Sequence, residues 1–330
     1  MKWFESNQAI LCLSPMADFT DRPFCRLIRE LDGRTVLFRE MLAAEALVRA
    51  NQRTLMMADL DEVERPVVQQ LFGSDPERMA QAAELIERRF KPDGIDINMG
   101  CPVYKAVSNF NGASLMREPE RAAAIVKAVK NAISIPLSVK TRLGWSKPDE
   151  VLEFVKVLED AGADAVEIHG RTKTQAYSGH ADWDAVGAAV KLVKIPVLVN
   201  GDVTDPDSAR MALEKSGAAG ILIARGALGR PWVFRRIRQA LETGVDPGEP
   251  SIQERLDIMR RHAQLQVEHY GENGLIQLRK HLPWYFSSRG GSASGGKGIP
   301  SFRQYRQQAV HVSTVQDVEN LISRIHSSPL

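Results

Sequence analysis

The chain has 330 residues, of which 44% are hydrophobic and 25% are charged, a balance that excludes a collagen, a coiled coil and a disordered tail. It contains no run of about 18 apolar residues, and its first residues do not resemble a secretory signal, so we expect no membrane span. Three cysteines are too few for a disulfide framework, and we therefore expect a protein of the reducing cytoplasm.

The formal net charge of +2 conceals an uneven distribution of charge along the chain. Residues 225–330 contain 15 Lys and Arg against 9 Asp and Glu, whereas the part before them is net acidic. A basic C-terminal part favours a polyanionic partner. A solvated helical face would give the same charge, and the charge alone does not separate the two interpretations.

Eight short segments of nearly continuous apolar character follow one another along the first 226 residues. Such segments are typical of parallel strands that are covered on both faces. They are residues 10–14, 36–40, 66–73, 94–100, 136–142, 165–170, 196–202 and 220–226.

Helical patterns lie between the expected strands, and those at residues 75–90, 118–132 and 205–216 each begin with an acidic residue followed by Pro. Weak internal repeats, such as SIPLSVK (134–140) and KIPVLVN (194–200), support a series of βα units. The sequence therefore predicts an α/β fold, a (β/α)8 TIM barrel over residues 1–244. A doubly wound open sheet is the alternative, but no G-x-G-x-x-G follows the first strand.

The pattern changes after VDPGEPS (245–251), a segment typical of a linker. Helical patterns without strands follow, and they predict a small all-α helical bundle domain over residues 251–330. Within it, a continuous helix through Arg279 and Lys280 would place Lys280 beside Trp284 and His281 beside Tyr285, so that cations and rings share one face. The alternative is that the rings pack the core of the domain while the cations point to water. The Gly-rich stretch 290–298 is interpreted as a flexible connection, with a phosphate-binding loop as the less favoured alternative.

Polar side chains are expected to gather at one end of the barrel, because the carboxyl ends of the strands form the active-site face of this fold. Burying so many polar groups is costly unless they meet a ligand. The polar residues at these ends are Gln69, Gln70, Asn98, Cys101, Lys140, Arg142, His169, Arg171, Thr172, Asn200, Asp202 and Arg225.

The last two strand ends favour a phosphate site, which this fold often builds there. Gly201 and Gly226 allow backbone amides to approach a ligand, and Arg225 adds positive charge. The same glycines also suit tight turns, so this alternative stays open.

Lys140 and Cys101 are the candidates for chemistry at this face. Lys140 is either a Schiff-base nucleophile or a fixed cation beside an electron-rich ring such as a flavin. Cys101 follows a strand between Gly100 and Pro102, and a thiol that is protonated near pH 7 can donate a proton. Without a C-x-x-C pair, a metal site or a dithiol is not expected, and Cys12 and Cys25 are interpreted as buried structural residues.

Several motifs together resemble the tRNA-dihydrouridine synthases, over nearly the whole chain and in the order of that family. The most specific is DINMGCPVYKAVSNFNGASL (96–115). The others are SPMADFTDRPFCR (14–26), VQQLFGSDP (68–76), VKTRLGW (139–145), IHGRT (168–172), VNGDVTD (199–205), IARGALGRPWVF (223–234) and LRKHLPWY (278–285).

The resemblance implies an enzyme that reduces the C5–C6 double bond of specific uridines in tRNA, using FMN reduced by NADPH and Cys101 as general acid. It implies a set of FMN-binding residues: Pro15, Met16, Ala17, Gln70, Lys140, His169, Asn200, Gly201, Asp202, Ala224 and Arg225. Ala224 departs from the Gly that the family usually has there. The resemblance also implies that Asn98 holds the edge of the uracil. It implies further substrate contacts by Arg142 and Tyr177, and by Arg279 and Lys280 in the helical domain.

Three other functional classes fit part of the sequence. A flavin barrel that acts on a free pyrimidine, like a dihydroorotate dehydrogenase, would not need the basic helical domain. A phosphate-binding lyase or isomerase would contain no flavin, and a tRNA-binding protein without catalysis would not depend on Cys101. We expect a monomer that needs no obligate protein partner.

Overall fold

The computed structural model describes residues 3–102, 111–286 and 302–327. The Gly-rich stretch 290–298 and part of the Cys101 motif, residues 103–110, lie outside the described residues.

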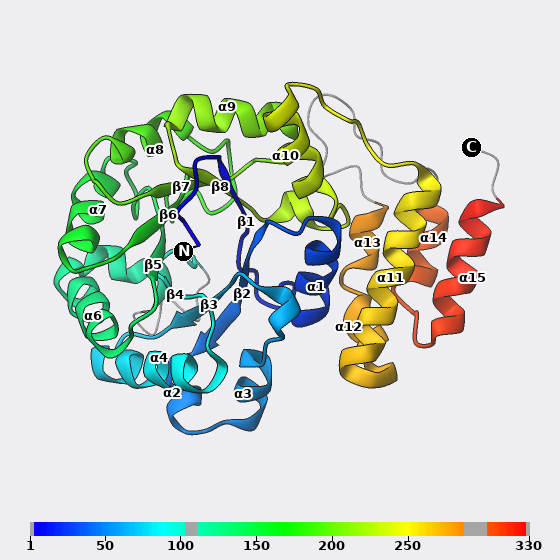
Figure 1. The fold of residues 1–330 in the computed structure, drawn as a ribbon, viewed down its shortest axis with the longest axis horizontal. Coiled ribbons are helices and arrows are strands. Elements are labelled where there is room, and N and C mark those ends of the chain that lie inside the picture. Colours follow the sequence, from blue (N-terminus) through cyan, green and yellow to red (C-terminus); the bar gives the residue numbers. More distant parts are fainter. Residues whose placement is uncertain (1–2, 103–110, 287–301, 328–330) are drawn as a thin grey trace.

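The N-terminal part is a closed barrel of eight parallel strands, in which each strand pairs with its neighbours in chain order and β8 pairs with β1 (Figure 1). All eight expected strands are confirmed, and only β2 runs beyond its predicted segment. The strands are β1 (Ile10–Leu13), β2 (Val36–Ala43), β3 (Val67–Phe72), β4 (Gly94–Asn98), β5 (Leu137–Arg142), β6 (Ala165–His169), β7 (Val197–Asn200) and β8 (Gly220–Ile223).

Helices surround the barrel and alternate with the strands along the chain, which confirms the predicted TIM barrel (Figure 1). Asp75 and Asp205 cap α4 and α9 with their side chains, and a Pro begins each of these helices, as the sequence predicts. The surrounding helices are α1 (Arg22–Leu31), α2 (Ala44–Val48), α3 (Gln52–Ala58), α4 (Pro76–Phe90), α6 (Pro119–Ala132), α7 (Glu150–Asp160), α8 (Trp183–Val190), α9 (Pro206–Ser216) and α10 (Val233–Thr243). Short 3-10 turns are η1 (Glu62–Glu64), η2 (Gly112–Arg117) and η3 (Arg225–Ala227).

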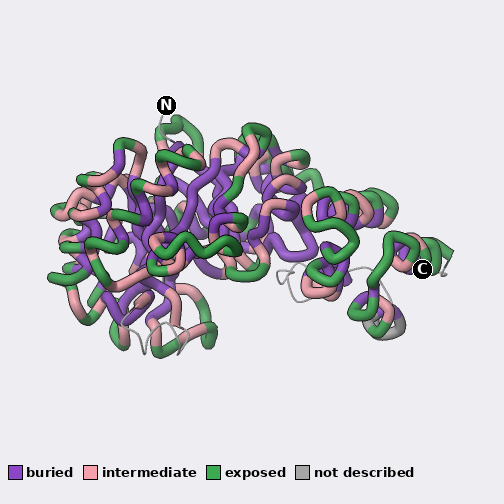
Figure 2. The backbone as a smooth tube through the Cα atoms, turned by 90° about the horizontal axis from the view of Figure 1, so that it is seen from below, coloured by how far each residue is buried: buried purple, intermediate pink, exposed green. Residues whose placement is uncertain are grey.

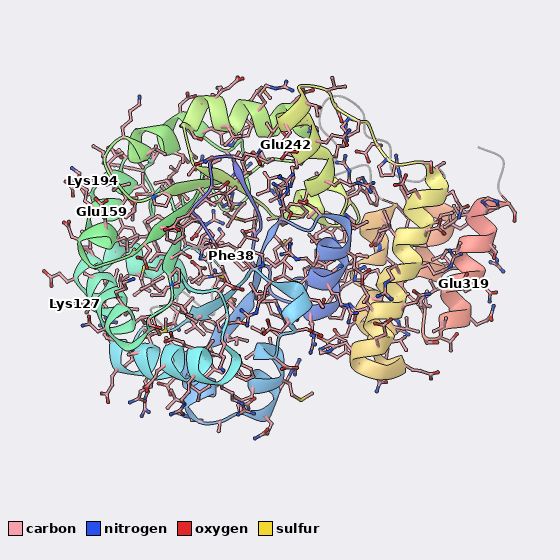
Figure 3. The ribbon with its side chains drawn as sticks, in the orientation of Figure 1. Phe38, Lys127, Glu159, Lys194, Glu242 and Glu319 are labelled. Atoms are coloured by element: carbon pink, nitrogen blue, oxygen red, sulfur yellow. The ribbon has the colours of Figure 1, made fainter. Side chains whose placement is uncertain are left out.

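The barrel has two apolar layers, one between strands and helices and a smaller one inside the strands. The inner layer is closed at the N-terminal end of the strands by Trp3 and Phe38, whose rings meet edge to face at 5.3 Å. Phe38 lies in the middle of the barrel in Figure 3, and Figure 2 shows that buried backbone runs through the whole barrel. Because this end is filled by apolar side chains, the polar residues of the interior gather toward the other end.

The C-terminal part is helical, as predicted, and lies beside α1 (Figure 1). Gln266 of α11 donates a hydrogen bond to Asp21 at 3.1 Å, and Arg261 pairs with Glu30 of α1 at 2.7 Å. These contacts join the helical part to the barrel at one edge. Its elements are α11 (Ile252–Tyr270), η4 (Gly271–Asn273), α12 (Gly274–Leu278), α13 (Leu282–Tyr285), α14 (Phe302–Ala309) and α15 (Val315–His326).

The continuous helix expected through Arg279 and Lys280 is wrong, because α12 ends at Leu278 and α13 begins at Leu282. Pro283 has no N–H to donate to a carbonyl of the preceding turn, so the regular hydrogen bonding of a continuous helix is interrupted there. Tyr285 is buried in the core of this part instead of sharing an exposed face with the cations.

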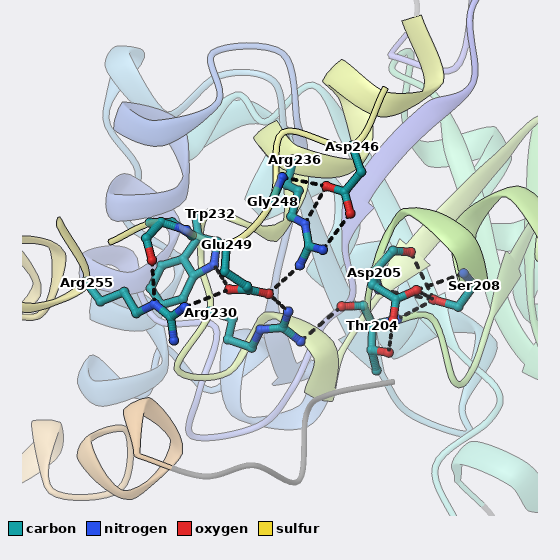
Figure 4. A network of polar contacts seen from close by, with 11 residues as sticks. Thr204, Asp205, Ser208, Arg230, Trp232, Arg236, Asp246, Gly248, Glu249 and Arg255 are labelled. Atoms are coloured by element: carbon teal, nitrogen blue, oxygen red, sulfur yellow. Dashed lines mark hydrogen bonds and ion pairs between the residues drawn. The ribbon is translucent and has the colours of Figure 1, made fainter. Parts of the chain in front are cut away.

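The segment between α10 and α11 is held by a network of ion pairs (Figure 4). The carboxylate of Glu249 accepts hydrogen bonds from the buried guanidinium groups of Arg230 and Arg236 and, at 2.8 Å, from the indole of Trp232. Arg236 also pairs with Asp246 at 2.6 Å. The predicted linker is therefore fixed against the barrel.

None of the helices that the structure describes has the length and apolar character needed to cross a membrane.

Candidate active site

A series of hydrogen bonds crosses the polar end of the barrel from β3 to the loop after β4. Gln70 donates to Asp96 at 2.5 Å and accepts from the side chain of Asn98 at 2.9 Å. The side-chain oxygen of Asn98, Oδ1, then accepts hydrogen bonds from the backbone N–H groups of Gly100 at 3.2 Å and Cys101 at 3.0 Å. Asn98 thus fixes the start of the loop that carries the thiol.

Cys101 is half-buried at this end of the barrel, whereas Cys12 and Cys25 are fully buried, as the sequence predicts. Gly112 packs against it with φ of +60°, and a Cβ at Gly112 would lie 2.9 Å from the Cys101 carbonyl oxygen. Burial raises the pKa of the Cys12 and Cys25 thiols, which keeps both protonated. Cys101 is therefore the thiol among the three that is accessible from the barrel end.

Lys140 of β5 and Asn200 of β7 meet inside the barrel, where the ammonium donates to the Asn200 side-chain oxygen at 3.1 Å. Burial, followed by the charge of Arg142, lowers the pKa of Lys140 to about 8. Burial and the charge of Lys140 also lower the pKa of His169 well below its usual range, so this imidazole is neutral near pH 7. A cation and a neutral imidazole thus line one side of the site.

The turn after β7 brings Gly201 and Asp202 against this side. Gly201 has φ of +116°, and a Cβ there would lie 2.8 Å from the His169 ring. The Asp202 carboxylate is held by the buried Arg171 at 2.7 Å and by the backbone N–H of Ala181 at 2.7 Å. Asp202 is therefore part of the wall of the site, with its carboxylate already neutralised.

Arg225 follows β8, and its guanidinium is half-exposed at 3.9 Å from Asp202. Ala224 has φ of −103°, a value that does not require Gly, so its methyl group adds no left-handed strain at this position. The exposed Tyr177 ring lies between the guanidinium groups of Arg225, at 4.8 Å, and Arg142, at 5.7 Å. The ends of β7 and β8, where a phosphate is expected, thus carry the half-exposed cation of Arg225 with the ring of Tyr177 beside it.

Arg142 is buried and donates three hydrogen bonds to backbone carbonyls: Gly100 at 2.7 Å, Thr172 at 3.1 Å and Ala176 at 2.9 Å. These bonds tie the Cys101 loop to the loop after β6. The contacts of Arg142 are therefore those of a residue that positions the two loops.

The remaining predicted site residues lie around the edge of this end. Pro15, Met16 and Ala17 form the loop after β1 and are partly or fully exposed. The Lys280 ammonium lies 6.0 Å from the ring of Phe19 in the same loop, whereas Arg279 is directed elsewhere and donates to the carbonyl of Val312 at 2.7 Å. The structure thus brings Lys280 toward the barrel end and leaves Arg279 within the helical part.

Sequence reasoning placed Arg171 at the end of β6 without giving it a role, and it did not single out Asp96 or Glu167. Arg171 is buried and is the hydrogen-bonding partner of Asp202, and Asp96 and Glu167 are buried carboxyls inside the barrel. A charged residue within an otherwise apolar strand segment was the available signal for the two acids. Among the described residues, no group of three or more His, Cys, Asp or Glu side chains is placed to hold a metal ion.

Structural comparison finds solved proteins with a similar fold. Histamine dehydrogenase from Rhizobium sp. 4-9 matches with a TM-score of 0.55 at 15% identity, over 77% of this chain and 48% of that one. A 2-naphthoyl-CoA reductase matches with a TM-score of 0.52 at 14% identity, over 70% of this chain and 50% of that one. At these identities the likeness concerns the fold.

Sequence comparison gives much closer relatives. The family model of dihydrouridine synthase (Dus) matches residues 12–328. A probable tRNA-dihydrouridine synthase 1 of Synechocystis sp. is 36% identical over 96% of this chain and 86% of its own length. A tRNA-dihydrouridine synthase B of Proteus vulgaris is 40% identical over 83% of this chain and 85% of its own length. The chain belongs to the dihydrouridine synthase family.

Proposed function

We propose that this protein reduces the C5–C6 double bond of uridines in tRNA to 5,6-dihydrouridine, with FMN as cofactor and NADPH as reductant. The observation that carries the proposal is the position of Cys101. Its half-buried thiol stands at the carboxyl end of β4, on a loop held by Asn98 and Arg142, close to the layer that contains Lys140 and His169.

The residues at this end of the barrel fit a flavin. The turn at Gly201 packs too closely on His169 for any side chain, so the backbone of this turn is not covered by a side chain of its own. Lys140 and the neutral His169 would face the ring system, and Arg225 would hold the phosphate. The chain has one expected phosphate site and no G-x-G-x-x-G motif after its first strand. This favours FMN, a mononucleotide, over the dinucleotide FAD.

When bound, the reduced flavin would supply a hydride to C6 of the uracil, with NADPH as the source of the electrons. Cys101 would hold a proton at Sγ and donate it to C5. The Lys140 ammonium would stabilise negative charge on the flavin. The contact of Asn98 with the uracil edge stays a prediction, and in the structure its amide holds the Cys101 loop.

A base must leave its stack to reach such a site, and we propose tRNA as the partner that presents it. The basic helical part would hold phosphates, while Tyr177 between its two arginines would contact RNA at the edge of the site. We propose that the enzyme acts as a cytoplasmic monomer, with residues 1–244 as the catalytic domain and residues 251–330 as the tRNA-binding domain.

The test measures bound flavin and product together. The purified protein should release FMN on denaturation and, with NADPH, should form dihydrouridine in unmodified tRNA but not in free uridine or dihydroorotate. Cys101→Ala should lower dihydrouridine formation by ~10²–10⁴-fold, because a positioned general acid contributes that much. Reduction of FMN by NADPH should not change in this variant.

Recovery of FAD, or of no flavin after reconstitution with FMN, contradicts the cofactor assignment. A normal rate of dihydrouridine formation by Cys101→Ala would show that Cys101 has a structural role.

A further inference from the structure

Two carboxyl groups lie inside the barrel directly below the polar layer of the site. Asp96 on β4 and Glu167 on β6 are both fully buried. They point inward, because their strand neighbours, such as Ile95 and Val166, belong to the outer apolar layer. β5 lies between them, and it pairs Ser138 with Asp96 and Lys140 with Glu167 in register.

The hydrogen bonding of the two carboxyls differs. Asp96 accepts the hydroxyl of Ser138 at 2.9 Å on one oxygen and the amide of Gln70 at 2.5 Å on the other. Both oxygens of Glu167 are buried and accept no hydrogen bond in the part of the chain that the structure describes. The Asp96 carboxyl lies against them, and two carboxyls form a hydrogen bond only when one of them carries a proton. An ionised carboxylate in such a place would be very costly, whereas a neutral carboxylic acid costs much less.

The charges around Glu167 also favour its neutral, protonated form. Burial and the Asp96 carboxylate raise the pKa of Glu167 well above its usual range, and Lys140 opposes them more weakly. Across the barrel, Cys12 of β1 is fully buried, and its pKa is raised by burial and by Glu167. The Lys140 ammonium lowers the pKa of both carboxyls, and its single charge balances one carboxylate of the pair.

The ionised member of the pair determines the direction of the hydrogen bonds above it. A side-chain amide has a donor end and an acceptor end. Because Asp96 as a carboxylate can only accept, Gln70 turns its NH₂ to Asp96 and its oxygen to Asn98. Asn98 then turns its oxygen to the N–H groups of Gly100 and Cys101.

We propose that Glu167 is the protonated member of a carboxyl pair with Asp96. The proton of Glu167 is donated to Asp96, which stays ionised and therefore only accepts hydrogen bonds. This fixes the orientation of the Gln70 and Asn98 side-chain amides, which hold the Cys101 loop. Glu167 and Asp96 are positioning residues in this scheme. It rests on the proposed function for the importance of Cys101, but the protonation and the geometry are measurable without turnover.

Two neutral variants of Glu167 test whether its hydrogen-bond donor is needed. Glu167→Gln is neutral and still donates, and Glu167→Leu is neutral without a donor. Infrared spectra of the flavin-free protein near pH 7 should show the C=O band of a buried protonated carboxyl in the wild type and should lose it in both variants. Circular dichroism confirms folding, and the wild-type spectrum tests the protonation even if Glu167→Leu does not fold.

Hydrogen exchange of the Gly100 and Cys101 amides, followed against pH, tests the positioning. Burial raises the pKa of Asp96 to about 6, so protection in the wild type should fall as the pH drops through this value. Glu167→Gln should keep this transition. Glu167→Leu should move it up by about one pH unit, the size expected when one hydrogen bond to an ionised carboxylate is lost. Dihydrouridine formation should follow the same order.

Two results would overturn the proposal. One is a wild type without the protonated-carboxyl band. The other is a transition that moves to lower pH in Glu167→Gln, because removal of a neighbouring negative charge has that effect. If the spectra and the exchange behave as expected but no dihydrouridine forms, the proposed function fails alone.

Discussion

Lys140 is a buried cation whose charge depends on pH within the range of ordinary enzyme assays. Its pKa is lowered to about 8, first by burial, and an exposed lysine keeps its charge until ~10.4. The Lys140 ammonium is therefore lost as the pH rises through about 8, and any stabilisation of a bound flavin by this charge is lost with it.

We expect FMN affinity to fall about tenfold between pH 7 and pH 9.5, which corresponds to ~1.4 kcal/mol for one charge-assisted interaction. Fluorescence titration of the flavin-free protein with FMN measures this decrease. Lys140→Met should bind FMN weakly at every pH, without this decrease. The exposed Lys127 provides the control variant, Lys127→Met, and an unchanged decrease in Lys140→Met would contradict the assignment.

At the scale of an element, the turn after β7 shows how close packing forms one wall of the site. Gly201→Ala would place a Cβ 2.8 Å from the His169 ring at a φ of +116°. We expect a loss of ~1–3 kcal/mol of stability from backbone strain and a similar loss from overpacking, together with weaker FMN binding. Gly217→Ala is the matched control, since Gly217 has φ of +61° with open space around it. It should cost only ~1–2 kcal/mol and leave FMN binding unchanged. Equal effects in the two variants would contradict this explanation.

The segment between α10 and α11 gives a second prediction at this scale. Glu249 is mostly buried, as are its partners Arg230 and Arg236 (Figure 4). Glu249→Gln removes the carboxylate that these two guanidinium groups share, while Arg236 keeps its pair with Asp246, and we expect a loss of ~3 kcal/mol in urea unfolding. The half-exposed pair of Arg235 and Glu254 is the control, and Glu254→Gln should cost less than ~1 kcal/mol. Similar losses in both variants would show that the network does not fix the segment.

At the scale of the whole molecule, the question is how the basic helical part and the barrel act on one tRNA. Neutralising Arg279 and Lys280 together would also remove the hydrogen bond from Arg279 to Val312. Lys280→Gln alone is the sharper test, because Lys280 lies near Phe19 at the edge of the site.

We expect Lys280→Gln to weaken tRNA binding and to reduce the log–log salt slope by roughly 0.7–0.9, the contribution of one phosphate contact. Reduction of FMN by NADPH should stay the same. Lys127→Gln on the outer face of α6 is the control (Figure 3). An unchanged salt slope in a folded Lys280→Gln protein would place the tRNA elsewhere.

The sequence by itself determined the barrel and the residues at its polar end. Continuous apolar strands and capped helices are local patterns, and the fold places every strand end on the same face, so residues such as Lys140, His169 and Asn200 were predictable as neighbours.

Only the tertiary structure decided which polar groups are already used within the protein. Asp202 is neutralised by Arg171, Arg142 holds two loops, and Arg279 is directed away from the site. The helix expected through Arg279 is interrupted before Pro283, and the buried pair of Asp96 and Glu167 became visible only once β4, β5 and β6 lay side by side. The partner and the burial of a charged side chain depend on residues far away in the chain, and local sequence patterns do not contain that information.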